Sequence, residues 1–180
     1  MIMDALRDRI PEYARDLRLN IASVLTPQGA PGLNEPQLWM TALATAIASR
    51  NAELARLIEA EATARLQPAQ IEAARAAAAI MGMNNVYYRF LHLVEDEEYS
   101  RLPARLRMNV LGSPGIARAD FELVSLAVSA VNGCGKCVLA HERVLRQHEV
   151  SREAVQSAVR IASVIHAVAG VLDYETARAA

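Results

Sequence analysis

The chain is organised around the stretch Asn132-Gly133-Cys134-Gly135-Lys136-Cys137-Val138-Leu139-Ala140-His141, which holds its only two cysteines. Asn-Gly is a turn dipeptide that favours a helix break, and from Cys134 to Leu145 the spacing of apolar residues is helical. At about 100° per residue, Cys134, Cys137 and His141 fall on one face of such a helix. The stretch therefore predicts a C-x-x-C pair at the start of a helix, with a histidine one turn further on.

A cysteine at the start of a helix is placed for thiol chemistry. The unpaired N–H groups and the helix dipole favour an anion there, so the pKa of Cys134 is expected below the ordinary cysteine value of about 8.5. A C-x-x-C pair on a helical turn can also close a disulfide, so that one cysteine attacks and the other resolves. Redox chemistry is therefore the leading interpretation.

Three other interpretations compete with redox chemistry. Two buried cysteines can act as small hydrophobic residues. The neighbouring Gly133 and Gly135 argue against this role, because glycines beside the cysteines make poor core packing. A structural zinc site commonly needs four ligands, and the remaining histidines lack a partner at ligand spacing. A structural disulfide across so short a span would constrain the unfolded chain only weakly.

Three further residues are candidates for work beside the thiols. His141 follows Cys137 at a neighbouring helical position and can accept a proton or stabilise a thiolate, although a half-buried packing role is the alternative. Glu122 lies in the first turn of the preceding helix between apolar neighbours, so it is either a partly buried carboxylate or a complement to the helix dipole. Lys136 is expected to point to solvent, away from the face of the cysteines, while its charge favours thiolate.

The composition bounds the class of protein. The 180 residues are 53% hydrophobic but only 4% aromatic, with a formal net charge of -1. Alanine-rich sequence of this kind suits closely packed helices in a single domain over 1–180. No polybasic run points to nucleic acid or an anionic membrane, and no signal-peptide core stands at the start. A cytoplasmic location is expected, where a C-x-x-C is more often catalytic or metal-binding than structural.

The fold class predicted along the whole chain is all-α, because no segment reads convincingly as a strand. This excludes the thioredoxin scaffold, which places its C-x-x-C after a strand. Particular expectations are a break near Gly82, a charged turn over Glu95–Ser100, a short helix over Arg101–Val110 and Asp120 as a helix cap. Further caps or helix starts are expected at Pro11, Asn34 with Gln37, Pro68 and Ser151.

A weak internal repeat is one interpretation of the helical pattern. The halves, about 37–80 and 122–165, share the order helix, small-residue break, helix, turn, helix. The cysteines occur in the second half only, and Ser49 and Ala52 take roughly their places in the first. Chance alignment of alanine-rich helices is the alternative.

The extended pattern carries a family resemblance. Glu122, eleven residues, and then C-x-x-C-x-x-x-H over Cys134, Cys137 and His141 resemble the AhpD family of alkyl hydroperoxide reductases, within the carboxymuconolactone decarboxylase-like superfamily. The resemblance covers nearly the full chain. Its other segments are Pro11-Glu12-Tyr13-Ala14, Gln37-Leu38-Trp39, Ile80-Met81-Gly82-Met83-Asn84-Asn85-Val86, Arg107-Met108-Asn109 and Pro114-Gly115-Ile116.

The resemblance implies an all-helical, commonly trimeric thiol peroxidase that also reduces a partner peroxiredoxin, with electrons from a dihydrolipoyl group on a lipoylated protein. By position, Cys137 matches the peroxidatic cysteine that forms sulfenic acid and Cys134 the resolving thiol and proton donor. Glu122 and His141 match the proton relay. No bound cofactor or metal is expected. Gly135-Lys136 stands where better-known members often carry Ser-His, so proton transfer loses one imidazole.

Two other functions remain as alternatives. A decarboxylase or lactone-acting enzyme of the same superfamily would not depend on both cysteines. A non-enzymatic redox-sensing helical module would be oxidised stoichiometrically without turnover.

Overall fold

The computed structural model describes residues 2–179, with side chains from 4 to 179, and the described chain is all-α without a strand. Short 3-10 turns separate some of its α-helices. The elements are α1 (Ile2–Asp8), η1 (Glu12–Ala14), α2 (Arg15–Val24), α3 (Glu35–Ala48), α4 (Ala52–Thr63), α5 (Pro68–Leu93), α6 (Glu97–Arg101), η2 (Asn109–Leu111), α7 (Arg118–Val131), α8 (Gly135–Gln147) and α9 (Arg152–Ala179).

The starts of several helices follow from local side-chain chemistry. Asn34 Oδ1 accepts a hydrogen bond from the Gln37 N–H at 2.8 Å while the Gln37 side chain accepts one from the Asn34 N–H, so the predicted capping box forms. Pro68 is the first residue of α5, where its missing N–H costs nothing. Ser151 caps α9 by accepting from the Ala154 N–H at 3.0 Å.

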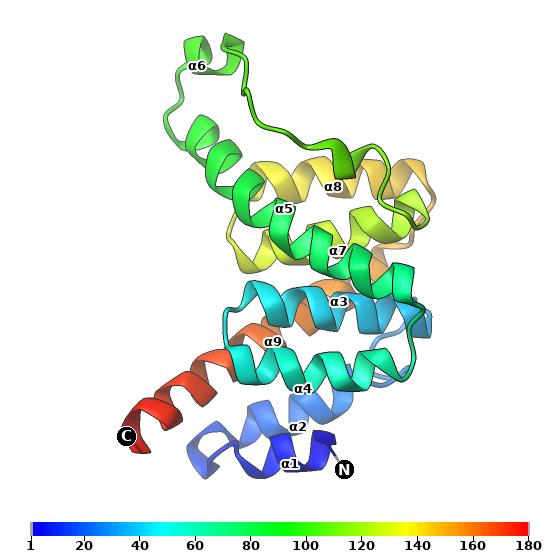
Figure 1. Ribbon diagram of the computed structural model, residues 1–180, viewed down its shortest axis with the longest axis vertical. Coiled ribbons are helices and arrows are strands. Elements are labelled where there is room, and N and C mark those ends of the chain that lie inside the picture. The colour runs from blue at the N-terminus through cyan, green and yellow to red at the C-terminus, as the bar shows by residue number, and fades with distance from the viewer. Residues whose placement is uncertain (1, 180) are drawn as a thin grey trace.

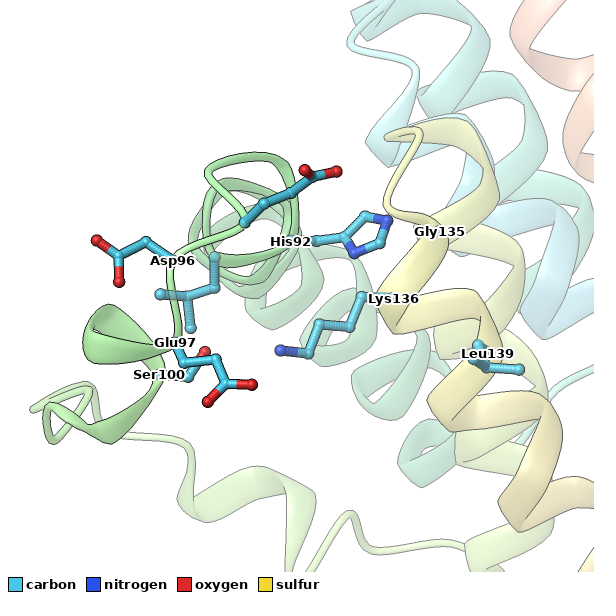
Figure 2. A pocket seen from close by; sticks show the side chains of 9 residues that line it. His92, Asp96, Glu97, Ser100, Gly135, Lys136 and Leu139 are labelled. Atoms are coloured by element: carbon cyan, nitrogen blue, oxygen red, sulfur yellow. The ribbon is translucent and has the colours of Figure 1, made fainter.

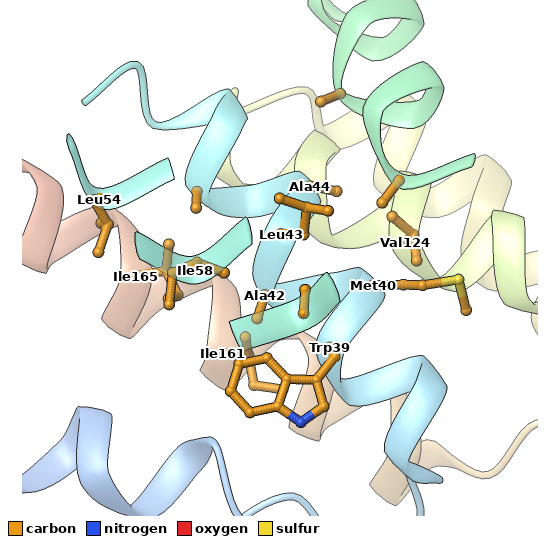
Figure 3. Packing of buried hydrophobic residues seen from close by; sticks show 14 of the residues in the cluster. Trp39, Met40, Ala42, Leu43, Ala44, Leu54, Ile58, Val124, Ile161 and Ile165 are labelled. Carbon is orange, nitrogen blue, oxygen red and sulfur yellow. The ribbon is translucent and has the colours of Figure 1, made fainter. Parts of the chain in front are cut away.

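Helices α3 and α7 form the centre of the molecule. Each has nine consecutive buried residues, over 38–46 in α3 and 121–129 in α7, because each is covered on several sides. Helix α3 contacts α4, α5, α7 and α9, and α7 contacts α5, α8 and α9 (Figure 1). In the core, Trp39 and Met40 of α3 lie among Val124 of α7 and Ile161 of α9 (Figure 3).

The stretch between α5 and α7 departs from three expectations. Helix α5 runs without a break through Gly82 to Leu93, because both flanking segments favour helix and pack on α3 and α7. The turn predicted over Glu95–Ser100 contains α6, whose start Asp96 caps by accepting from the Glu98 N–H at 2.9 Å.

The helix predicted over Arg101–Val110 is wrong. Pro103 disfavours helical geometry at the residue before it, and Leu102 accordingly has an extended backbone with ψ 140°. The chain then runs without helix to η2 and passes across α8 (Figure 1).

The capping role predicted for Asp120 is also wrong. Helix α7 begins at Arg118, its N-cap Ala117 has no side-chain cap, and Asp120 is the third residue of the helix. Asp120 Oδ1 instead accepts a hydrogen bond from Gln37 Nε2 at 2.7 Å, which ties the start of α7 to the start of α3.

Helix α9 is long and apolar enough to cross a membrane by length and composition alone, the one described helix of which this holds. Its apolar side chains are used inside the protein, since it packs on α2, α3 and α7 and buries Ile161, Ile165 and Leu172. The helix is therefore explained as a core element.

Candidate active site

The turn between α7 and α8 places the first cysteine. Gly133 has φ 69°, in the left-handed region that glycine adopts without strain. The Cys134 N–H donates to the Ser129 carbonyl at 3.1 Å, which closes the end of α7. Cys134 thereby becomes the N-cap of α8, as the sequence predicts.

The two cysteines form a disulfide, with their Cα atoms 5.3 Å apart. Cys134 is 0% exposed and Cys137 is 6% exposed, so both are buried and solvent reaches only the second residue of the pair. The Cys137 N–H also donates to Cys134 Sγ at 3.3 Å. On reduction, this N–H and the helix N-terminus favour a thiolate at Cys134.

Glu122 and His141 are in direct contact between α7 and α8. His141 Nδ1 lies 2.6 Å from Glu122 Oε2, and Arg118 Nη2 lies 2.6 Å from Glu122 Oε1. Burial of Glu122 favours its neutral form, but the hydrogen bond from His141 and the charges of His141 and Arg118 outweigh burial and hold the pKa of Glu122 below its ordinary value.

The ionised state of Glu122 fixes the tautomer of its partner. A carboxylate can only accept hydrogen bonds, so His141 Nδ1 donates to Glu122 and carries the proton. The other ring nitrogen, Nε2, takes no part in this hydrogen bond. The pair is thus an imidazole held in one orientation by a buried carboxylate.

A pocket of about 230 Å³ opens beside Cys137. Cys137 and His141 both line it, together with Lys136, so the structure brings three of the sequence-predicted residues to one pocket. The rest of its wall is mostly apolar and comes from α5, α8 and the segment after α6: Met81, Asn84, Tyr88, Met108, Leu111 and Ala140.

Lys136 is exposed, as predicted, but it also separates two pockets. On its other side lies a pocket of about 470 Å³ bordered by His92, Glu95, Asp96 and Glu97. Figure 2 shows the Lys136 side chain extending from α8 toward Glu97 across this second pocket. The ammonium group therefore lies between the cysteine pocket and an acidic rim.

A polar network behind the turn was not anticipated from sequence. Asn85 Nδ2 donates to Ser129 Oγ at 2.9 Å, and Asn85 Oδ1 accepts from Asn132 Nδ2 at 2.9 Å. Arg89 Nη1 donates to the Asn132 carbonyl at 2.6 Å. Helix α5 thus holds the turn that carries the cysteines. Asparagine within an apolar helix was the available signal, as was the Arg118–Glu122 spacing of four for the ion pair.

The sequence raised zinc as an alternative. Among the described side chains, no group of three or more histidine, cysteine, aspartate or glutamate residues is arranged to hold a metal ion. The cysteines that would serve as ligands are bonded to each other.

Comparison with known proteins places the chain. The profile of the Carboxymuconolactone decarboxylase family matches residues 97–177, which include Glu122, Cys134, Cys137 and His141. Alkyl hydroperoxide reductase AhpD of Rhodospirillum centenum is 55% identical over 98% of this chain and 94% of its own length. The AhpD of Frankia alni is 57% identical over 94% of this chain and 90% of its own. The AhpD of Streptomyces coelicolor is 52% identical over 100% of this chain and 99% of its own. On this similarity, the chain belongs to the AhpD family of alkyl hydroperoxide reductases.

Proposed function

We propose that the protein is a thiol-dependent alkyl hydroperoxide reductase in which Cys137 is the peroxidatic cysteine and Cys134 the resolving one. One observation carries the assignment: the two residues form a disulfide of which only Cys137 opens to a pocket, and His141 lines that same pocket. The names of the relatives support the same activity.

The peroxide step uses the reduced pair. The Cys137 thiol gives its proton to His141 Nε2, and the thiolate attacks the terminal oxygen of the hydroperoxide. The S–O bond forms as the O–O bond breaks, and the alkoxide leaves with a proton from His141 as an alcohol. Cys134 then attacks the Cys137 sulfenic acid, which closes the disulfide and releases water. Glu122 stabilises the positive charge on His141 between these transfers.

Regeneration starts from the disulfide that the structure contains. A thiolate of a dihydrolipoyl group on a partner protein attacks Cys137 Sγ, and Cys134 leaves as a thiolate. The Cys137 N–H that donates to Cys134 Sγ stabilises this leaving group. The second lipoyl thiol then displaces Cys137 and closes the lipoyl disulfide, so two electrons pass to the protein. The same dithiol reduces the disulfide of an AhpC-like peroxiredoxin, and no bound cofactor takes part.

We also propose that the protein is a cytoplasmic homotrimer. The end of α5 and the segment after it expose large apolar side chains, among them Phe90 at 46%, Leu93 at 70% and Leu102 at 62%. Exposed apolar side chains that gather in one region commonly mark contact surfaces, so packing against further copies here would remove these side chains from water. Sedimentation at micromolar concentration tests this, and a monomer would contradict it.

The activity is tested by turnover of tert-butyl hydroperoxide with dihydrolipoamide as reductant, in wild type and in Cys137→Ser. We expect multiple turnovers in wild type and none above background in the variant, because the attacking sulfur is gone. One oxidation per chain without turnover would instead indicate a redox sensor. Turnover of a lactone or decarboxylation that survives in Cys137→Ser would indicate the decarboxylase alternative.

A further inference from the structure

Asn84 of α5 is a buried side chain whose carbonyl oxygen has no hydrogen-bond partner in the fold. It is 4% exposed, and its Oδ1 is buried without a hydrogen-bond partner. Its neighbour Asn85 is 1% exposed, yet both ends of its carboxamide are paired, with Ser129 and Asn132. An unpaired buried acceptor destabilises a protein, so a residue kept in this state calls for an explanation outside folding.

The surroundings of Asn84 indicate where its partner comes from. It lines the pocket of about 230 Å³ that also exposes Cys137 and His141. Tyr88, Lys136 and His141 also line this pocket, but none of them is bonded to Asn84 Oδ1. Because Oδ1 is itself buried, a rotation of the Asn84 side chain toward the pocket is needed before a molecule there can supply the missing partner beside Cys137.

The geometry points to Asn84 as the residue that binds the hydroperoxide group during the peroxide step, an inference that rests on the proposed function. A hydroperoxide has an O–H donor and two oxygen acceptors, and a carboxamide has the complementary acceptor and donors. Holding the O–O–H group in this way orients its terminal oxygen toward Cys137 Sγ. The bond changes are those of the peroxide step above: the S–O bond forms, the O–O bond breaks, and the alkoxide leaves with a proton from His141.

The test replaces Asn84 by leucine, which keeps the shape and removes the hydrogen-bonding atoms. We expect kcat/KM for tert-butyl hydroperoxide to fall about ten- to a hundred-fold, in the range found when one oriented hydrogen bond to reacting atoms is lost. Alkylation of the reduced protein by iodoacetamide should stay within about two-fold, since that reagent does not need the bond. The thermal midpoint should stay equal or rise, whereas Asn85→Leu should lower it because Ser129 and Asn132 lose their partner.

A second pair of variants makes the result independent of leucine packing. Asn84→Ala and Asn84→Ser differ by one hydroxyl, so the serine variant should recover part of the peroxide rate that the alanine variant loses. The inference is overturned if Asn84→Leu keeps the wild-type kcat/KM, if its peroxide and alkylation rates fall together, or if serine and alanine are equal. Absence of peroxide turnover in wild type is a different result, which would overturn the proposed function and this inference with it.

Discussion

The turn from α3 to α4 and the turn from α7 to α8 follow the same backbone path. Between the first two helices, Arg50 takes the left-handed conformation with φ 64°, and between the second two, Gly133 takes it with φ 69°. The N-cap residues come next, Asn51 with φ -88° and Cys134 with φ -95°. Each of their side chains accepts a hydrogen bond from the N–H three residues on. The α3–α4 turn connects two helices, whereas the α7–α8 turn also carries the candidate active site.

The comparison also corrects the internal alignment. The cysteines correspond to Asn51 and Leu54, the residues in the same capping hydrogen bond, and not to Ser49 and Ala52. Helices α3 and α7 both have 14 residues, which agrees with the proposed repeat, although its origin by duplication stays a prediction.

The residues around the two turns differ where chemistry is needed. The fifth residue is Trp39 in α3 and Glu122 in α7, and the seventh is Ile58 in α4 and His141 in α8. Trp39 and Ile58 are core residues, whereas Glu122 and His141 form a hydrogen-bonded pair. The backbone thus supplies a buried N-cap position at both turns, and the two turns differ in the side chains around that position.

The largest loss of activity is expected when the two cysteines of the α7–α8 turn are replaced by the corresponding residues of the α3–α4 turn. Cys134→Asn with Cys137→Leu should fold, because asparagine is a strong N-cap and already caps α4 in this way. Peroxide turnover should fall at least about a thousand-fold, as it does when a nucleophile is removed. Circular dichroism checks that the variant folds, and peroxide turnover with dihydrolipoamide as reductant measures the loss of activity. Activity above about one per cent of wild type would show that the cysteines are not the reacting groups.

The reverse exchange is the matched control. Asn51→Cys with Leu54→Cys, in a chain whose own cysteines are serine, should close a disulfide on the similar backbone but turn over no hydroperoxide. Trp39 and Ile58 offer no base there. Mass spectrometry reports the disulfide, and measurable turnover would mean that the backbone turn suffices by itself.

Glu122→Gln tests the side-chain difference. The glutamine keeps the shape but not the charge that orients His141 and stabilises its protonated form, so turnover should fall about a hundred-fold. The rate with tert-butyl hydroperoxide measures the effect. A wild-type rate would reduce Glu122 to a packing residue, like Trp39.

The same variant has a defined pH signature. The pKa of Glu122 is held below its ordinary value of 4.5 in the folded protein, so its carboxylate contributes stability above about pH 4.5 and loses it as pH falls through the lower folded pKa. Urea titrations from pH 5 downward measure the difference in free energy of unfolding between wild type and Glu122→Gln. It should change below pH 4.5 in the direction that disfavours wild type. A difference that is flat to pH 3 would contradict the lowered pKa.

Local rules were enough to predict much of this architecture. The capping pair Asn34–Gln37, Pro68 and Ser151 mark helix starts because each acts through groups within a few residues. Cys134 at the start of a helix followed from Asn-Gly before it. The all-α class followed from the helical spacing of apolar residues.

The features that sequence did not predict depend on distant partners. Asp120 has the composition of a cap, but its oxygen is taken by Gln37 of α3. The contrast between Asn84 and Asn85 cannot be read from two adjacent asparagines, because only the packing of α5 on α7 decides which one finds Ser129. The missed extended segment at Leu102 is different, since Pro103 was a local signal.

Arg118→Gln should have a smaller effect than Glu122→Gln. The Arg118 side chain is 45% exposed, so its ion pair with Glu122 is screened by water. We expect turnover to fall about two- to five-fold, the equivalent of a pair worth up to about 1 kcal/mol. The effect should shrink further in 1 M salt. A loss as large as that of Glu122→Gln would assign Arg118 a direct role at the pocket.

The smallest effect is expected from a substitution at the second residue of α8, which corresponds to the second residue of α4. In α4 the second residue is Glu53, whose negative charge complements the helix N-terminus. In α8 it is Lys136, the only lysine of the chain. Lysine at this position opposes the helix dipole, whereas its positive charge favours a thiolate next to it. Lys136→Glu should therefore stabilise the reduced protein by about 0.3–1 kcal/mol. It should also raise the thiol pKa by less than about one unit, because the exposed charge is screened.

Thermal unfolding and the pH dependence of iodoacetamide alkylation measure the two effects, with Lys136→Gln expected midway in both. Lys136→His should raise peroxide turnover if an imidazole there assists proton transfer. If Lys136→Glu changes neither the stability nor the alkylation profile, the charge at the start of α8 does not contribute to the difference between the α3–α4 turn and the α7–α8 turn. That difference would then rest on the cysteines, Glu122 and His141.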